Sequence, residues 1–137
     1  MIVDTSALAA IVFDEAGIGP IITALGRESG TIIAPVIVEL RRVTGLSRNQ
    51  PSGVVDRLLE KLQRARIVIG PFTAAAAEAA LVANARYGSG GGLGGPLNML
   101  DLMVYGAAKV AGLPILCTGK DFTATDALIH PASRRDA

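Results

Sequence analysis

The chain has 137 residues, of which half are hydrophobic and 18% charged, and its formal net charge is +1. This length suits one domain with a buried core, and the composition argues against disorder. The small net charge gives no general attraction to nucleic acid, so a polyanionic partner would need local basic residues or a metal ion. The single cysteine and single histidine exclude a disulfide framework and the usual cysteine or histidine zinc sites, and they leave little for a Ser-His-Asp triad.

The first 45 residues are predicted to alternate short strands with helices. An apolar strand over residues 1–3 ends at Asp4, and a helix follows in the segment DTSALAAIVFDE, where Thr5 or Ser6 can serve as the N-cap. Branched side chains predict a second strand at 31–34. Two further helices are expected, at 20–25, closed by Gly26, and at 35–45.

The second half of the chain continues this alternation. The segment VVDRLLEKLQRAR places apolar residues at helical spacing and predicts an amphipathic helix over 54–66. Thr73 is expected to cap an alanine-rich helix, and Asn98 to cap a helix that Gly112 stops. Between these two helices lies a glycine-dense loop, YGSGGGLGGP, without a phosphate-loop pattern. Two more strands are predicted, at 66–70 and 113–119.

Strands that alternate with helices predict an α/β fold whose mainly parallel central sheet is covered by helices on both faces. We find no internal repeat and no domain boundary, so residues 1–137 are expected to form one domain, with about 128–137 as a peripheral tail. No run approaches the roughly 20 apolar residues of a spanning helix, and no basic segment precedes the apolar start. We therefore expect a cytoplasmic protein.

Four acidic residues are expected at the carboxyl edge of this sheet, where open α/β sheets bind their ligands. Asp4 ends the first strand, Glu39 lies just inside the helix after the second strand, and Asp121 follows the last strand. Asp101 is in the first turn of the helix that Asn98 caps. Carboxylates in one site repel one another unless a divalent cation offsets their charge, and oxygen ligands suit Mg²⁺ or Mn²⁺. Because such an ion can activate water and stabilise a phosphoryl group, the pattern indicates metal-dependent phosphodiester chemistry.

Each of these acids also has a purely structural interpretation. Asp101 can complete a reciprocal cap with Asn98, and Glu39 can form an i,i+3 pair with Arg42. Asp4 is the hardest to explain in this way, because no basic residue near it in the sequence would offset its burial. Asp121 and Asp126 lie in the last loop, and because Asp favours turns, their presence there needs no functional explanation.

With these residues identified, the sequence closely resembles the PIN-domain ribonucleases, and among them the VapC toxins of toxin–antitoxin pairs. The resemblance covers nearly the whole chain and rests on MIVDTSALAAIVFDE, on the glutamate in APVIVELRR, on YG…LNMLDLMVYGAAK and on LPILCTGKDFTATD. It implies a PIN-like three-layer fold, a metal-dependent endoribonuclease with an RNA substrate, a homodimer, and inhibition by a VapB-like antitoxin whose C-terminal segment occupies the groove. The loop GSGGGLGGP departs from the family, in which this segment is often basic, so the loop lacks side chains suited to contact RNA there.

The resemblance further implies that Asp4, Glu39, Asp101 and Asp121 form the acidic metal pocket. In this hypothesis Asp4 and Asp101 are direct ligands, while Glu39 and Asp121 act through water or hold a second ion. Water activated by the ion would attack the phosphorus in line and leave 5′-phosphate and 3′-hydroxyl ends. Groups expected to support the ligands are Thr5, Ser6, Thr118 and Asp126.

Contacts to the substrate are predicted from basic residues near the rim of this pocket. Stacking on many bases is not expected, because the chain has no Trp, two Tyr and three Phe. Specificity is therefore expected to come from RNA shape. The basic candidates, for each of which a solvated surface position is an equally good interpretation, are Arg41, Arg42, Arg48 and Lys120.

Three other classes of protein are alternatives to a nuclease. A phosphotransferase with an aspartyl nucleophile would need an acid two residues after Asp4, where Ser6 stands. A receiver domain would need an acid pair after the first strand, which Asp4 and Thr5 do not supply. A PIN-like interaction module without activity is the alternative from another class, and the full acid set argues against it.

The remaining residues of chemical interest have simple interpretations. Cys117 in an apolar strand is expected to be a core thiol, and Met99 and Met103, at helical spacing, are expected in the core. His130 has no partner histidine and is interpreted as an incidental surface or packing residue.

Overall fold

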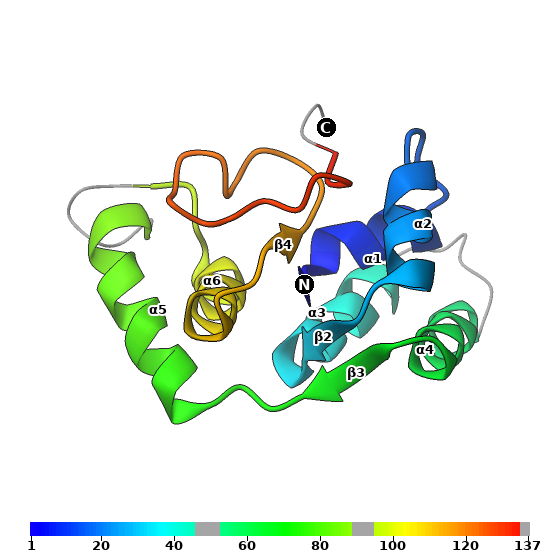
Figure 1. Ribbon diagram of the computed structural model, residues 1–137, viewed down its shortest axis with the longest axis horizontal. Coiled ribbons are helices and arrows are strands. Elements are labelled where there is room, and N and C mark those ends of the chain that lie inside the picture. The colour runs from blue at the N-terminus through cyan, green and yellow to red at the C-terminus, as the bar shows by residue number, and fades with distance from the viewer. Residues whose placement is uncertain (46–52, 89–94, 135–137) are drawn as a thin grey trace.

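The computed structural model describes residues 1–45, 53–88 and 95–134. In these ranges two helices separate each strand from the next (Figure 1). The strands are β1 (Ile2–Val3), β2 (Gly30–Ile33), β3 (Ile67–Gly70) and β4 (Ile115–Leu116). The helices are α1 (Thr5–Val12), α2 (Gly19–Arg27), α3 (Ala34–Gly45), α4 (Val54–Arg64), α5 (Ala74–Tyr87) and α6 (Met99–Ala111).

The four strands form one parallel sheet in the order β3-β2-β1-β4. Ile2 of β1 is in register with Thr31 of β2 on one side and with Ile115 of β4 on the other. The central strands are almost fully buried between helices, as expected of a parallel sheet. The predicted α/β class with a mainly parallel sheet is therefore confirmed.

The helix starts agree with the predicted caps except at α1. The side chain of Thr73 accepts a hydrogen bond from the N–H of Ala76, and Asn98 forms the predicted capping box with Asp101. At α1 the predicted caps Thr5 and Ser6 are wrong, because Asp4 occupies the N-cap position and accepts from the N–H of Ser6. Asp is as good an N-cap as Ser, so the structure extends the helix by one residue toward the strand.

Helix α5 lies at one end of the molecule and packs mainly against α6 (Figure 1). The two backbones approach closely at Gly106, where an added Cβ would lie 2.3 Å from the carbonyl oxygen of Ala76. Only glycine permits this approach. Helix α6 then ends at Gly112, whose φ of +66° is the left-handed conformation that favours glycine at a helix C-terminus.

Strand β4 is shorter than the predicted 113–119, because the chain beyond it is paired differently. The N–H of His130 donates to the carbonyl of Ile115, and the N–H of Gly119 donates to the carbonyl of Arg134. Residues 128–134, expected to be part of a peripheral tail, therefore run beside β4 and hydrogen-bond to it. His130 is 7% exposed, so its interpretation as a packing residue agrees with its burial.

Across the described ranges, none of the helices has the length and apolar character that crossing a membrane would require.

Candidate metal centre

Asp4 lies directly after β1, at the carboxyl edge of the sheet, and its residue is 6% exposed. One carboxylate oxygen, Oδ2, accepts from the N–H of Ser6 at 3.1 Å and from the Ser6 hydroxyl at 2.5 Å. Burial raises the pKa of Asp4, the hydrogen bonds from Ser6 lower it, and the charge of Glu39 raises it further. Burial has the largest effect, so the anionic form of Asp4 is held at an energetic cost.

Asp101 is buried in the first turn of α6, with its residue 9% exposed. Its Oδ2 accepts from the N–H of Asn98 at 3.1 Å, which is half of the capping box. The pKa of Asp101 is raised to about 7, chiefly by burial, and the carboxylates of Asp4, Asp121 and Glu39 raise it further against the lowering effect of the Asn98 hydrogen bond. The capping interpretation of Asp101 is thus correct, but it does not account for the three other acids around it.

Glu39 projects from α3, which follows β2, and Asp121 is exposed on the loop after β4. Both are close enough to raise the pKa of Asp101 through their charge. The structure therefore brings the four acids from four separate segments to one edge of the sheet. None of the ion pairs formed among the described residues involves any of these four acids. The Glu39–Arg42 pair, which was the structural alternative for Glu39, is not among them.

The four carboxylates lie at one edge of the sheet but do not yet converge on a common position for a metal ion. Within 1–45, 53–88 and 95–134, no three His, Cys, Asp or Glu side chains are preassembled as a metal-binding group. Oδ2 of Asp4 accepts from Ser6, and Oδ2 of Asp101 accepts from the backbone N–H of Asn98. The donors nevertheless fit a hard divalent cation, because all are carboxylate oxygens and two are buried without a cationic partner among the described residues.

Of the three hydroxyls predicted to support the acids, that of Ser6 contacts Asp4 directly. The hydroxyl oxygen of Ser6 accepts from the N–H of Thr118 at 3.0 Å, and the Thr118 hydroxyl donates to the carbonyl of Ser6 at 3.4 Å. These bonds join the loop that carries Asp121 to the start of α1. The hydroxyl of Thr5 is buried and has no hydrogen-bond partner within the described part of the chain.

Asp126, the fourth predicted supporting residue, binds Tyr105 and Lys109 and none of the four acids. One of its oxygens accepts from the Tyr105 hydroxyl, and the other pairs with Lys109 at 2.8 Å. The hydrogen bond from Lys109, followed by that from Tyr105, lowers the pKa of Asp126. Burial and the hydrogen bond to Asp126 raise the pKa of Tyr105. Tyr105 and Lys109 were not predicted as partners of Asp126, although both follow Asp101 at steps of four residues on one face of α6.

Of the four predicted substrate contacts, three lie within the described residues. Arg41 forms an exposed ion pair with Asp56 of α4 at 2.7 Å, so this guanidinium already has an anionic neighbour. Arg42 and Lys120 are exposed. Arg48 lies outside the described residues, as does most of the glycine-rich loop.

The predictions for the sulfur-containing residues are partly wrong. Cys117 is buried in the core and Met103 packs partly against it, as expected. Met99 is 78% exposed, contrary to its expected core position. The cause is the phase of α6: Asp101 faces inward with Val104 and Tyr105, so a residue two positions earlier faces outward.

Comparison with known proteins shows which family the chain resembles. The PIN domain family matches residues 1–128. Ribonuclease VapC42 of Mycobacterium tuberculosis is 41% identical over 135 residues, covering 96% of this chain and 98% of the relative. Ribonuclease VapC36 of the same organism is 35% identical over 129 residues, covering 92% and 90%.

Solved structures agree at the level of the fold. A toxin–antitoxin complex from Klebsiella pneumoniae superposes with a TM-score of 0.70 at 14% identity, over 95% of this chain and 96% of the other. VapBC2 from Rickettsia felis, bound to a DNA fragment from its promoter, gives 0.62 at 17% identity, over 93% and 94%.

Proposed function

Since the chain belongs to the PIN-domain family, and within it to the VapC ribonucleases, we propose that it is a Mg²⁺- or Mn²⁺-dependent endoribonuclease toxin whose acids hold the metal. In this proposal Asp4 and Asp101 are direct ligands, and Glu39 and Asp121 bind through water or hold a second ion. Asp126 is left out of the metal centre, because Lys109 and Tyr105 bind both of its oxygens.

The observation that carries the proposal is the pair of buried carboxylates, Asp4 and Asp101, with raised pKa values. Two further acids add charge of the same sign, and no ion pair among the described residues offsets it. A folded protein keeps such an arrangement at the expense of stability, which is typical of a functional site. A divalent cation would convert the repulsion into binding.

A bound divalent ion supplies activation of water and stabilisation of negative charge on a phosphoryl group. Other residues of the chain hold the carboxylate ligands in position. Ser6 fixes the orientation of Asp4 by donating its hydroxyl, and the Asn98 cap fixes Asp101 at the start of α6. Arg42 and Lys120 are exposed and suited to hold RNA phosphates beside the acids.

The proposed partners are an RNA substrate, a VapB-like antitoxin and a second copy of the chain, and the proposed compartment is the cytoplasm. The fold is shared with a solved toxin–antitoxin complex and with VapBC2, which supports an antitoxin partner. Inhibition by an antitoxin segment in the groove at the acids follows from the same proposal.

The test is cleavage of total RNA by the purified chain with Mg²⁺, with Mn²⁺ and with a chelator. We expect metal-dependent cleavage that leaves 5′-phosphate ends and falls at least about 100-fold in Asp4→Asn and Asp101→Asn. Asp14→Asn is the matched control, because Asp14 is an exposed acid whose φ of +50° asparagine also adopts. Equal cleavage by the wild type and both site variants, or cyclic phosphate ends, would contradict the proposal.

A further inference from the structure

Asp126 joins the loop after β4 to helix α6. We call residues 118–127 the β4 loop. One oxygen of Asp126 accepts from the Tyr105 hydroxyl, and the other accepts from Nζ of Lys109 at 2.8 Å. Within the described part of the chain, no other side-chain hydrogen bond connects this loop to α6. A hollow of about 290 Å³ lies between α6 and residues 126–128, so the two bonds cross a region that side chains do not fill.

The β4 loop is stiffened by two consecutive turns. Thr123 donates its N–H at 3.0 Å and its hydroxyl at 2.6 Å to the carbonyl of Lys120. Thr125 donates in the same way to the carbonyl of Phe122, at 3.1 Å and 2.7 Å. Turns closed by a hydroxyl as well as a backbone N–H restrict the chain locally. Asp121 lies inside the first turn, so a shift at the far end of the loop is passed on to it.

Two other anchors hold this loop before the chain reaches Asp126. Thr118 is bonded to the hydroxyl of Ser6, and Phe122 is buried in the core. Two fixed points leave a stiff loop free to rotate about the line that joins them. Asp126 supplies a third point, and it therefore sets the direction in which Asp121 projects.

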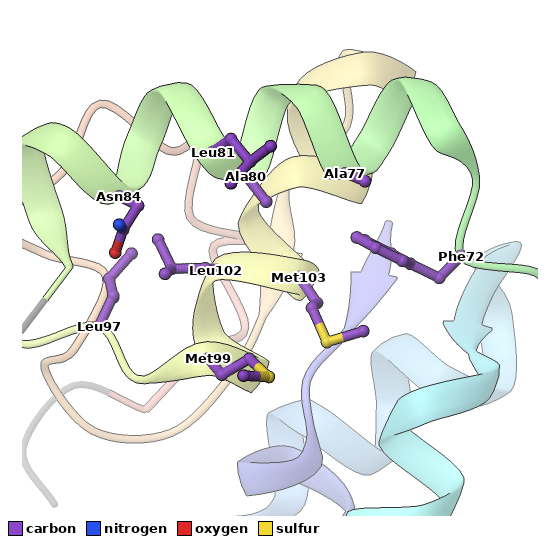
Figure 2. Close-up of a pocket in the computed structure, with 9 residues that line it drawn as sticks. All are labelled: Phe72, Ala77, Ala80, Leu81, Asn84, Leu97, Met99, Leu102 and Met103. Carbon is purple, nitrogen blue, oxygen red and sulfur yellow. The ribbon is translucent and has the colours of Figure 1, made fainter. Parts of the chain in front are cut away.

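Tyr105 and Lys109 lie on the face of α6 that also carries Asp101. Steps of four residues place these three side chains one above another on the helix. Leu102 and Met103 of the same helix line a separate, apolar hollow beside α5 (Figure 2). One face of α6 therefore carries both a proposed metal ligand and the two groups that hold the β4 loop.

The Tyr105 hydroxyl is the firmer of the two attachments. Tyr105 is 5% exposed, and its ring packs against that of Tyr87 with 5.8 Å between the centroids. The side chains of Lys109 and Asp126 are 54% and 47% exposed, and exposed ion pairs contribute little. We therefore expect the buried hydroxyl to account for most of the attachment.

We propose that Asp126 is a positioning residue of the metal centre. Tyr105 holds it to α6, and this bond fixes the direction of Asp121 relative to Asp101, which belongs to the same helix. The carboxylate of Asp126 itself stays away from the ion, and Lys109 assists as an exposed cation. The inference rests on the proposed function, because it requires that Asp121 takes part in metal binding.

The test measures binding of Mn²⁺ from the electron paramagnetic resonance signal of the free ion, beside RNA cleavage over a Mg²⁺ series. We expect Tyr105→Phe and Asp126→Ala to raise the Mn²⁺ dissociation constant about 3- to 10-fold. This is less than the roughly 10- to 100-fold effect of a group bonded directly to a ligand, because Asp126 acts through the loop. The half-saturating Mg²⁺ concentration for cleavage should rise by the same factor, and the rate at saturating Mg²⁺ should recover.

Two further variants separate positioning from general stability. Asp126→Asn keeps an acceptor for the Tyr105 hydroxyl and should hold the dissociation constant within about twofold of the wild type. In an Asp121→Asn background, Asp126→Ala should change the dissociation constant by less than about twofold, because the carboxylate that it positions is already lost.

Tyr87→Phe is the matched control. It removes a hydroxyl from the neighbouring ring, and this hydroxyl forms no hydrogen bond within the described residues. We expect it to change neither metal binding nor cleavage. Far-ultraviolet circular dichroism checks that every variant is folded.

Unchanged metal binding in both Tyr105→Phe and Asp126→Ala overturns the inference and leaves the proposed function intact. The inference also fails if Asp126→Ala has the same effect with and without the Asp121 carboxylate, or lowers the saturated rate without changing affinity. Those results would give Asp126 a role in stability alone. A wild type that binds no Mn²⁺ overturns the proposed function as well, so the two failures are distinguishable.

Discussion

The hydroxyl of Ser6 donates a 2.5 Å hydrogen bond to Oδ2 of Asp4, two residues earlier in the chain. The same oxygen of Ser6 accepts from the N–H of Thr118, more than a hundred residues later. Ser6 therefore links the first acid of the site to the loop that carries the last one, Asp121. A single side chain holds the orientation of a buried carboxylate and the position of the loop after β4.

Ser6→Ala removes this link and is expected to lower metal-dependent cleavage about 10- to 100-fold, the usual effect of losing a group that orients a metal ligand. We also expect a loss of about 1–2 kcal/mol of stability, because the N–H of Thr118 loses its acceptor. Cleavage assays and urea unfolding measure the two effects. Ser6→Thr keeps the hydroxyl and should restore much of the activity, while Ser29→Ala, on an exposed serine, should change neither quantity.

Asp4→Asn is expected to abolish cleavage and to leave the metal-free protein as stable as the wild type or more stable. The reason is that burial raises the pKa of Asp4, so its charge is held at a cost, while an asparagine can still accept from the N–H of Ser6. Thermal unfolding with a chelator measures the stability. Addition of Mg²⁺ should raise the melting temperature of the wild type and not of the variant. A large loss of stability in Asp4→Asn would assign a mainly structural role to this acid.

The stability of the metal-free protein is expected to fall as the pH rises from about 4 to about 7. Asp101 has a pKa of about 7 in the folded chain, above the ordinary value of 3.8, so the folded state binds more protons than the unfolded state in this window. Its contribution is therefore fully present below the lower value and lost as the pH passes the upper one. Urea unfolding at pH 5 and pH 8 with a chelator should show a fall of at most about 3 kcal/mol, since about two pH units of this window lie above pH 5.

Asp101→Asn should remove most of this pH dependence, because asparagine does not titrate but can still accept from the N–H of Asn98. Saturating Mg²⁺ should also reduce it, because the ion favours the ionised carboxylate. A slope that is the same in the wild type and in Asp101→Asn would show that other groups cause it.

Gly106→Ala should disrupt the contact between α5 and α6. The added Cβ would lie 2.3 Å from the carbonyl oxygen of Ala76, which belongs to a helix backbone and cannot move alone. We expect a loss of about 2–3 kcal/mol in urea unfolding. Gly26→Ala in α2 is the matched control: nothing lies within 4 Å of its added Cβ, so about 0.5–1 kcal/mol of stabilisation is expected. Equal effects at the two positions would contradict the close approach seen at Gly106.

The sequence by itself determined the order and type of the elements, the parallel sheet and most of the helix caps. These depend on local properties: branched residues favour the strands, helical spacing marks α4, and Thr73 and Asn98 cap the helices that follow them. The same local reasoning predicted that the four acids gather at the carboxyl edge of the sheet, because the carboxyl ends of parallel strands share one edge.

Only the tertiary structure decided which groups meet. Asp126 pairs with Lys109, residues 128–134 pair with β4, and Met99 is exposed because Asp101 takes the inward face of α6. Each outcome depends on contacts between segments distant in sequence, or on the rotation of a helix against its neighbours. Local propensity carries no information about either, because the packing of the whole core fixes both at once.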